Sequence, residues 1–374
     1  MTQVRSESPP IRAVTALVAF ILAVAIAPSA HAQIVPPGNF KIAFFGDQGL
    51  GPDSVAVLDL VLQEGAEAVV HTGDFDYAND PAAWEAQIDA TLGADFPYFA
   101  SAGNHDAAAF YGPGGYQEYL GARMQRLGIV WEGDLGVQSS FEYGGIFFVL
   151  TAPKEFGAEG DGYHDLYIRD QLAADDHLWR VSGWHKNMSL MQVGGKTDET
   201  GWGVYEESRR GGAIIATAHE HSYSRTHLLS SVELQTVAST QEPLALVADD
   251  PVTLEDEGRS FAFVSGLGGQ SIRDQEIVPD PPWWASIYTT TQDPNATYGA
   301  LFGVFNYEGD PRKARFYFKN VNGEVVDDFL VESQLFVPEP SARLLQVSAL
   351  AVLVGLRLLG RRGVPEPAEG RPTP

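Results

Sequence analysis

Three short apolar runs in the first third of the chain each lead into a polar loop. They are Lys41–Phe45 before Gly46–Gly49, Ala68–Val70 before Gly73–Tyr77, and Tyr98–Ala100 before Gly103–Asp106. Continuous apolar runs of this length, bounded by glycine-containing loops, are typical of buried strands. The pattern therefore predicts three buried strands, each ending in polar residues.

The segments between these runs have helical spacing. Asp53–Glu64 and Asp80–Leu92 carry apolar residues three and four positions apart, and Pro81 suits the first turn of the second helix. Strands that alternate with helices predict parallel pairing through right-handed crossovers. Because the loops at the carboxyl ends of such strands form the ligand crevice, we expect the polar loops to lie together.

The rest of the chain divides into a mixed part and a strand-rich part. The mixed part has expected helices at Tyr116–Leu127 and Leu166–Leu178, a hairpin of Val137–Tyr143 and Ile146–Leu150, and strands at Val181–Gly183 and Ala213–Thr217. The strand-rich part comprises Phe261–Val264, Leu301–Phe305, Ala314–Phe318 and Val325–Val331. Since no helices separate these last four strands, we expect them to form a second, more antiparallel sheet packed on the first.

Two long linking segments, Val232–Gly258 and Gln270–Thr297, interrupt the strand-rich part. Long structured loops on α/β domains often form the rim of an active site. They are equally compatible with surface elaboration, and the sequence does not decide between the two.

The N-terminal segment has the pattern of a secretory signal peptide. Arg5 and Arg12 precede an apolar run from Ala13 to Pro28, and Ala30-His31-Ala32 supplies an A-x-A cleavage site. We therefore expect residues 1–32 to be removed before Gln33. A membrane anchor is the alternative, although the run is shorter than the roughly 20 residues of a typical span.

Composition narrows the possible functions. The chain has no cysteine, which excludes disulfides, thiolate metal sites and cysteine nucleophiles. Its formal net charge is −25, and no basic patch interrupts it. Such a surface repels nucleic acid, so we expect no nucleic-acid partner.

Five polar elements follow predicted strands and carry the candidate chemistry. They are Asp47; Asp74 with Tyr77; Asn104 with His105 and Asp106; His185; and His219 with His221. An aspartate after a strand is commonly a helix cap, and a single histidine is more often structural than a ligand. Carboxylates, a phenol, an amide and imidazoles delivered to one crevice are, however, the groups that build a metal site.

Taken together and in this order, the elements resemble the calcineurin-like metallophosphoesterases, and within them the purple acid phosphatases. The matching blocks cover roughly Lys41 to Arg225, and Gly266–Gly269 with the strands of Tyr298–Val331 resemble the closing sheet of the family. Two positions depart from the family pattern: Ala218 replaces a usual glycine, and Lys186-Asn187-Met188 is unlike the phosphatase norm. These departures bear on the substrate more than on the metals.

The resemblance implies the fold and the ligand set. The fold is α/β, with two packed mixed β-sheets flanked by helices, a βαβαβ core and four layers, over a catalytic domain of residues 38–335. The family assigns one metal ion to Asp47, Tyr77 and His221 and a second to Asn104, His185 and His219, with Asp74 bridging both. His105 is implied as the acid that protonates the leaving oxygen or as a group that stabilises the transition state, and Asp106 as the residue that orients His105.

One position distinguishes the subgroup. Most relatives place a metal-binding histidine two residues after the first aspartate, where this chain has Gly49. Tyr77, three residues after Asp74, is where purple acid phosphatases place a phenolate instead. The resemblance therefore implies Fe(III) together with a divalent ion, Fe, Zn or Mn.

The implied function is the hydrolysis of small phosphate monoesters by attack of a metal-bound hydroxide. A phosphodiesterase acting on nucleotides, phospholipids or polymers is the nearest alternative on the same scaffold. A cell-surface or matrix protein that retains the fold without catalysis is an alternative of another class.

The C-terminal segment, residues 336–374, resembles a PEP-CTERM sorting signal. Pro338-Glu339-Pro340 precedes an apolar run from Leu344 to Gly360 and then Arg361-Arg362. The resemblance implies transient membrane anchoring and processing by an exosortase in a Gram-negative bacterium, hence a periplasmic, surface or extracellular location. Residues 363–374 extend beyond the usual end of such a signal, and a plain C-terminal anchor is the alternative.

Overall fold

The three apolar runs form adjacent parallel strands, as predicted. They are β1 (Phe40–Phe45), β2 (Ala68–Thr72) and β3 (Tyr98–Ser101), and their side chains are almost entirely buried. The connecting helices are α2 (Pro52–Gln63) and α3 (Pro81–Thr91). Pro81 occupies the first turn of α3, and the Asp80 side chain caps it by accepting a hydrogen bond from the amide of Ala83.

These strands belong to a seven-stranded sheet with the order β12-β17-β16-β15-β1-β2-β3. The remaining strands of this first sheet are β12 (Leu244–Leu246), β15 (Gly299–Phe305), β16 (Lys313–Asn320) and β17 (Val325–Ser333). Strand β15 is buried along its whole length and pairs antiparallel with β1. The sheet is therefore parallel on one side of β1 and mainly antiparallel on the other.

The second sheet has eight strands in the order β14-β9-β13-β8-β7-β6-β5-β4. They are β4 (Trp131–Asp134), β5 (Gln138–Tyr143), β6 (Ile146–Thr151), β7 (Trp179–Gly183), β8 (Ile214–Thr217), β9 (Tyr223–Thr226), β13 (Ala262–Ser265) and β14 (Trp284–Tyr288). Strands β10 (Leu228–Ser231) and β11 (Thr236–Ser239) form a separate hairpin. The central strands β6, β7, β8 and β13 run parallel.

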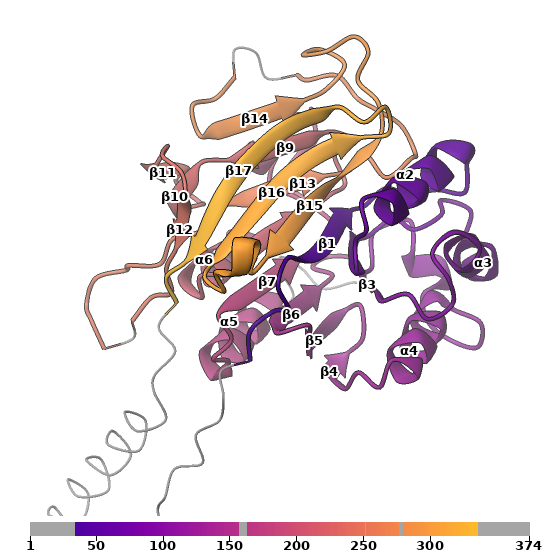
Figure 1. Ribbon diagram of the computed structural model, residues 1–374, viewed down its shortest axis with the longest axis horizontal. Helices are drawn as coiled ribbons and strands as arrows, with labels where there is room; N and C mark the ends of the chain where they lie inside the picture. Colours follow the sequence, from indigo (N-terminus) through magenta and orange to yellow (C-terminus); the bar gives the residue numbers. More distant parts are fainter. Residues whose placement is uncertain (1–33, 157–162, 251, 277–279, 336–374) are drawn as a thin grey trace, which may run out of the picture. The chain divides into compact units, whose positions relative to one another are not determined.

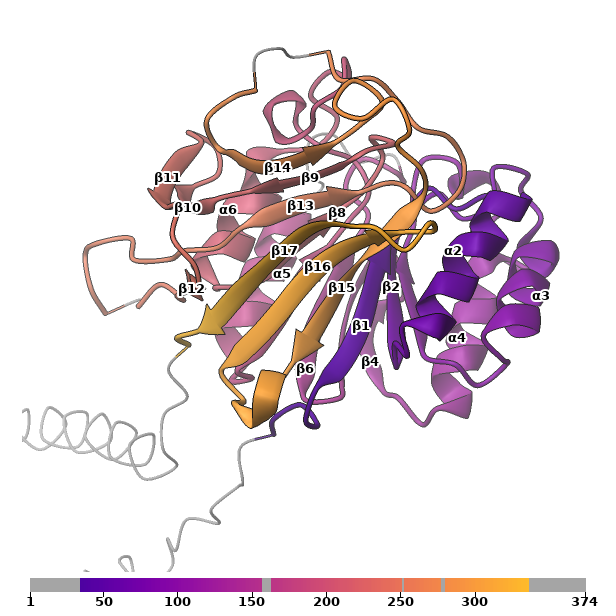
Figure 2. The same cartoon turned by 45° about the horizontal axis from the view of Figure 1, so that its top comes forward.

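Aromatic side chains fill the space between the two sheets. Phe44 on β1 packs on Phe263 of β13 with ring centroids 5.5 Å apart, and Phe305 on β15 packs on Trp179 of β7 at 5.1 Å. Helices α2, α3 and α4 (Tyr116–Arg126) lie together beside β1–β3 (Figures 1 and 2). Helices α5 (His164–Ala174) and α6 (Trp202–Arg210) cover the outer face of the second sheet through a second apolar cluster. The expected four layers, with two mixed sheets flanked by helices, are confirmed.

Two expectations about the elements were wrong. The four late strands do not form a sheet of their own, because β15–β17 extend the first sheet while β13 lies between β8 and β9 in the second. The helix expected to reach Leu178 ends at Ala174, since Asp175 has extended backbone and Trp179 already begins β7. Helix α6 and strands β9–β12 and β14 were not predicted.

The computed structural model describes residues 34–156, 163–250, 252–276 and 280–335. In these ranges no helix combines the length and apolar character needed to cross a membrane. The expected signal peptide at residues 1–32 and the expected sorting signal at residues 336–374 lie outside the described residues.

Candidate metal centre

All the candidate residues lie in loops at the carboxyl ends of strands that are neighbours within the two sheets. Asp47 follows β1, Asp74 and Tyr77 follow β2, and Asn104, His105 and Asp106 follow β3. His185 follows β7, and His219 and His221 follow β8. The two sheets thus bring their strand ends, and the polar loops, to one place.

Three of the side chains form a first ligand group, Asp47, Tyr77 and His221. The Tyr77 hydroxyl donates to Asp47 Oδ1 at 2.7 Å and lies 3.2 Å from His221 Nε2. His221 Nε2 is also 3.2 Å from Asp47 Oδ1. One carboxylate oxygen, one phenol oxygen and one imidazole nitrogen therefore converge on a single point.

A second ligand group contains His185 and His219, and Asn104 is its third expected member. His185 Nε2 lies 3.0 Å from His219 Nδ1 and 3.1 Å from Asp74 Oδ2, and Asp74, His185 and His219 could together hold an ion. The Oδ1 atom of Asn104 is buried and has no hydrogen-bond partner among the described residues. A buried acceptor without a partner is costly unless something outside the protein chain satisfies it.

Asp74 connects the two groups. Its Oδ2 faces His185, while its charge and that of Asp47, together with burial, raise the pKa of the Tyr77 phenol far above its usual range. The chain is also forced close to this carboxylate, because a Cβ at Gly103 would lie 2.3 Å from Asp74 Oδ1. Asp74 therefore contacts His185 of the second group and also interacts with Tyr77 of the first.

The backbone at the centre is held in an uncommon conformation. Asp47, Asp74, Tyr77 and His219 have φ values of 59°, 60°, 57° and 70°. This left-handed region is sparsely populated by residues other than glycine, and such outliers cluster at functional sites. The strain is sustained by specific contacts; for example, the His219 amide donates to Asp47 Oδ2 at 2.8 Å.

The two imidazoles of the second group have opposite pKa shifts. Burial lowers the pKa of His185, but the neighbouring Asp74 carboxylate outweighs it and raises that pKa to about 9. Burial lowers the pKa of His219 to about 4, with Glu199 opposing the shift. His185 therefore supplies a positive charge that a bound cation would replace, while His219 is already neutral, as a ligand requires.

His105 and Asp106 have different surroundings from each other. His105 is half exposed, its Nε2 is 4.0 Å from Asp74 Oδ2, and its ring packs on Tyr77 with centroids 4.5 Å apart. Asp106 is fully buried, and its carboxylate accepts hydrogen bonds from the amides of Asp74, Phe75 and Gly103 at 2.7–2.8 Å.

The expected role of Asp106 needs correction. We expected it to orient His105, but its hydrogen bonds among the described residues go to main-chain amides of two ligand-bearing loops. A carboxylate is well suited to this task, because two oxygens can accept several amides at once. Asp106 therefore fixes the loop of Asp74 against the loop of Asn104, and acts on the centre through the backbone.

Four residues of the centre were not identified from the sequence. Glu199 Oε2 lies 2.7 Å from His219 Nε2, and the Ser271 hydroxyl contacts His221 Nδ1. The Lys196 ammonium donates to the carbonyl of His219, and Arg273 Nη2 lies 3.5 Å from His221 Nε2. Ser271 and Arg273 belong to the linking segment Gln270–Thr297, which thus borders the centre. None of the four sits in a periodic segment or a recognisable motif. The long loop indicated the position of Ser271 and Arg273, and nothing in the sequence indicated that of Lys196 and Glu199.

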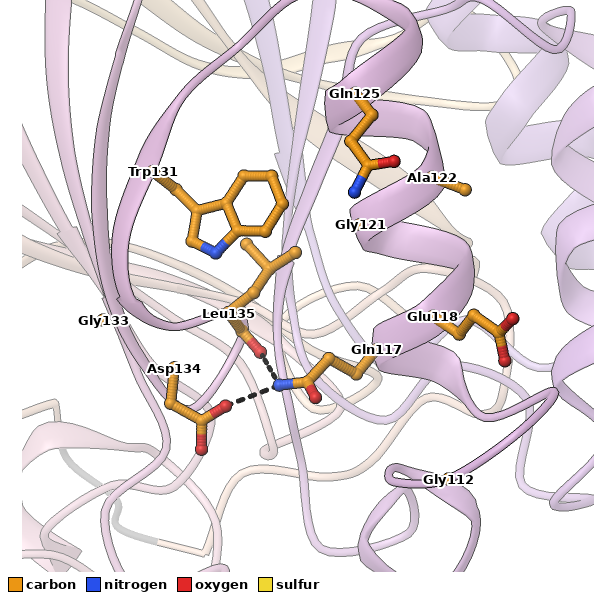
Figure 3. Close-up of a pocket in the computed structure, with 10 residues that line it drawn as sticks. All are labelled: Gly112, Gln117, Glu118, Gly121, Ala122, Gln125, Trp131, Gly133, Asp134 and Leu135. Atoms are coloured by element: carbon orange, nitrogen blue, oxygen red, sulfur yellow. Dashed lines mark hydrogen bonds between the residues drawn. The ribbon is translucent and has the colours of Figure 1, made fainter.

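A separate cavity of about 600 Å³ lies between α4 and β4 (Figure 3). Gln117 crosses it and donates from Nε2 to Asp134 Oδ1 at 2.6 Å and to the carbonyl of Leu135 at 2.9 Å. Trp131 and Gln125 form other parts of its lining. None of the candidate metal ligands or catalytic residues lines this cavity, so it is separate from the candidate metal centre.

Comparisons with known proteins agree with this geometry. Residues 40–223 match the family model described as calcineurin-like phosphoesterase. The structure is similar to that of purple acid phosphatase PPD1 from seeds of yellow lupin (Lupinus luteus), with a TM-score of 0.56 and 20% identity, over 80% of this chain and 55% of that chain. A search of curated proteins gave no match.

Two further structures are more distant. PhoD gives a TM-score of 0.45 with 12% identity over 83% of this chain and 76% of that chain. GAP50, the anchor in the inner membrane complex of Plasmodium, gives 0.46 with 11% identity over 79% and 91%. The lupin likeness shows the fold alone, and this chain spans little more than half of that enzyme. All the ligand-bearing loops, from Asp47 to His221, lie within the residues that match the calcineurin-like phosphoesterase model.

Proposed function

We propose that this protein is an exported phosphatase that uses two metal ions to hydrolyse small phosphate monoesters. The observation that carries the proposal is the convergence of six potential ligand side chains, Asp47, Asp74, Tyr77, His185, His219 and His221, at one place. A purely structural polar cluster would satisfy its own members, whereas here the Asn104 acceptor stays without a partner among the described residues.

The two groups differ in the ions that they suit. Asp47, Tyr77 and His221 would hold the first ion, and Asn104, His185 and His219 the second, with Asp74 between them. A carboxylate and a phenolate are hard, anionic ligands that favour Fe(III), and imidazoles with an amide oxygen suit a divalent Fe, Zn or Mn ion. When bound, the ions supply Lewis acidity, which polarises the phosphoryl group and activates water.

The protein side chains position the substrate and handle the proton. His105 is the half-exposed imidazole beside the centre, and it protonates the leaving oxygen or hydrogen-bonds to it. Asp106 keeps the loop of His105 fixed to the loop of Asp74 through the three amide hydrogen bonds. The positive charges of Arg273 and Lys196 at the centre attract an anionic substrate despite the acidic surface.

Export and processing complete the proposal. Export is supported by the expected signal peptide at residues 1–32, and processing by the expected sorting signal at residues 336–374. Both segments lie outside the described residues. We propose removal before Gln33, transient anchoring through the C-terminal segment and exosortase processing near Pro338–Pro340. N-terminal sequencing and intact-mass measurement on native material test this, and a full-length chain in the cytoplasm would contradict it.

The decisive experiment combines metal content with paired substrates. Purified protein should contain two metal ions per chain, and it should hydrolyse nitrophenyl phosphate faster than bis(nitrophenyl) phosphate. Faster cleavage of the bis-ester would indicate the phosphodiesterase alternative. Protein that keeps the ions and cleaves neither ester would favour the non-catalytic surface or matrix protein.

A further inference from the structure

Arg273 is the one arginine among the described residues that approaches a candidate metal ligand through its side chain. Its Nη2 is 3.5 Å from His221 Nε2, the nitrogen that faces Asp47 and Tyr77 in the first ligand group. The side chain remains 40% exposed. The guanidinium therefore approaches the first ligand group while it remains partly accessible to solvent.

The position of Arg273 is fixed from several sides. Its amide donates to the carbonyl of His221 at 2.9 Å, and its carbonyl accepts from the amide of Thr290 at 3.4 Å. Its Nη1 lies 3.3 Å from Glu220 Oε2 and 3.4 Å from the carbonyl of His219. Glu220 lies between the two histidine ligands in sequence and is almost fully buried. Its ion pair with Nη1 therefore fixes the guanidinium against the protein. A donor held in this way needs little reorganisation on binding.

The same arginine lines a cavity of about 540 Å³. The other walls include Lys196, Glu220 and Thr290. The Lys196 ammonium donates to the carbonyl of His219, and Arg273 reaches the same carbonyl with Nη1 while its Nη2 lies near His221 Nε2.

We infer that Arg273 selects phosphate monoesters over diesters by binding a phosphoryl oxygen that only a monoester leaves free. The inference rests on the proposed function and specifies its substrate class. A monoester has three oxygens without a substituent and carries close to two negative charges at neutral pH, whereas a diester has two such oxygens and one charge. A guanidinium fork presents two donors to this extra charge, and charged hydrogen bonds of this kind are the strong ones.

The test is Arg273→Gln in the full-length, metal-loaded protein, assayed on nitrophenyl phosphate and bis(nitrophenyl) phosphate. We expect kcat/KM for the monoester to fall about 10- to 100-fold, the range for one lost hydrogen bond to a charged group. The diester value should change by less than about threefold, because a diester offers no third oxygen. Arg273→Lys should fall between wild type and Arg273→Gln, since it keeps the charge but loses the fork.

Two further measurements distinguish loss of phosphate recognition by Arg273 from damage to the metal centre. Metal content by mass spectrometry should be unchanged in Arg273→Gln, and calorimetry should show weaker binding of inorganic phosphate than in wild type. The matched control is Arg315→Gln, which removes an exposed arginine paired with Asp328 at 2.6 Å on β16 and β17. It should match wild type in every assay.

Four results would overturn the inference. They are an equal loss on both esters, no loss on either, loss of metal from Arg273→Gln, or unchanged phosphate binding. Failure of the proposed function looks different, because wild-type protein would then bind metal and cleave neither ester. In that case the phosphate-binding comparison still decides whether Arg273 is the anion-binding residue.

Discussion

The two ligand groups of the centre distribute charge in opposite ways. The first group has its anionic atoms in direct reach of an ion, the Asp47 carboxylate and the Tyr77 phenol, and its histidine is backed by the neutral hydroxyl of Ser271. The second group combines imidazoles with an amide, and its negative charge lies one layer further out, where Glu199 contacts His219 Nε2. In the first group the negatively charged atoms are themselves potential ligands. In the second group the negative charge belongs to Glu199, which contacts a ligand but is not one.

This difference is the basis of our proposal that the two groups hold ions of unequal charge. Directly coordinating anions stabilise a trivalent ion most strongly, whereas a carboxylate behind an imidazole orients the ring and makes it a stronger donor for a divalent ion. The Arg273 guanidinium approaches a ligand nitrogen of the first group, where the greater ligand charge offsets it, and it meets the second group through the carbonyl of His219. The following predictions test whether the asymmetry is functional.

The largest effect should come from Asp74→Asn, because Asp74 serves both groups. Asparagine keeps the shape of the side chain but removes the charge that neutralises both cations. We expect loss of both ions and activity at background level, measured by metal analysis and monoester turnover on the same preparation. A variant that retains one ion at full occupancy would show that Asp74 belongs to a single group.

His105→Ala should give the next largest effect and should leave both groups intact. His105 is next to a proposed ligand in sequence but its ring is half exposed and 4.0 Å from Asp74 Oδ2. Removing a general acid lowers turnover by roughly two to four orders of magnitude. Metal content should equal that of wild type. Unchanged turnover, or loss of the ions, would remove His105 from the proposed mechanism.

The sequence predicted one half of this centre well because the positions of those residues follow from local patterns. Asp47, Asp74 and Asn104 each come directly after an apolar run, and a parallel βαβ arrangement carries such positions to one edge. The strands β1–β3 and the two helices between them were found within a residue or two. The loops that carry the candidate ligands therefore meet in the structure as the patterns suggested.

The residues behind the ligands were not predictable in the same way. Glu199, Ser271 and Arg273 reach the centre from loops whose paths depend on contacts between distant segments, such as the amide of Arg273 with the carbonyl of His221. Asp106 was identified, but its partners were not, because nothing in Gly103–Asp106 indicates which amides the carboxylate will meet. The sheet to which β13 belongs was predicted wrongly for a related reason. The apolar pattern of a strand indicates that it is buried but not which strands pair with it.

Tyr77→Phe separates the first group from the second. The variant keeps the ring that packs on His105 and removes the oxygen that lies 2.7 Å from Asp47 Oδ1. A phenolate bound to Fe(III) absorbs visible light, so the oxidised wild-type protein should be coloured and the variant should not. We expect weaker retention of the first ion and normal retention of the second, measured by absorption spectroscopy and metal analysis.

The pH dependence of binding sharpens the same test. Burial and the nearby carboxylates raise the pKa of the Tyr77 phenol, so a metal ion must displace its proton to bind the oxygen. The affinity of the first group should therefore rise with pH more steeply in wild type than in Tyr77→Phe. Colourless, fully active wild-type protein with two divalent ions would exclude the purple acid phosphatase type and leave the phosphoester hydrolase standing.

The smallest effect is expected from Glu199, which acts on the second group only through His219. His219 directs Nδ1 towards His185, so its Nε2 is free to donate to Glu199 Oε2 at 2.7 Å. Removing such a carboxylate typically weakens metal binding about 10- to 100-fold, and we expect Glu199→Ala to do so for the second ion alone. Glu199→Gln should lose less, because its amide oxygen can still accept the hydrogen bond.

The matched control is Glu276→Ala, which removes an exposed carboxylate on a neighbouring loop. This variant should bind both ions as wild type does. If Glu199→Ala weakened the binding of both ions equally, the Glu199 carboxylate would act on the whole centre. The difference between the two groups would then be limited to the ligands themselves.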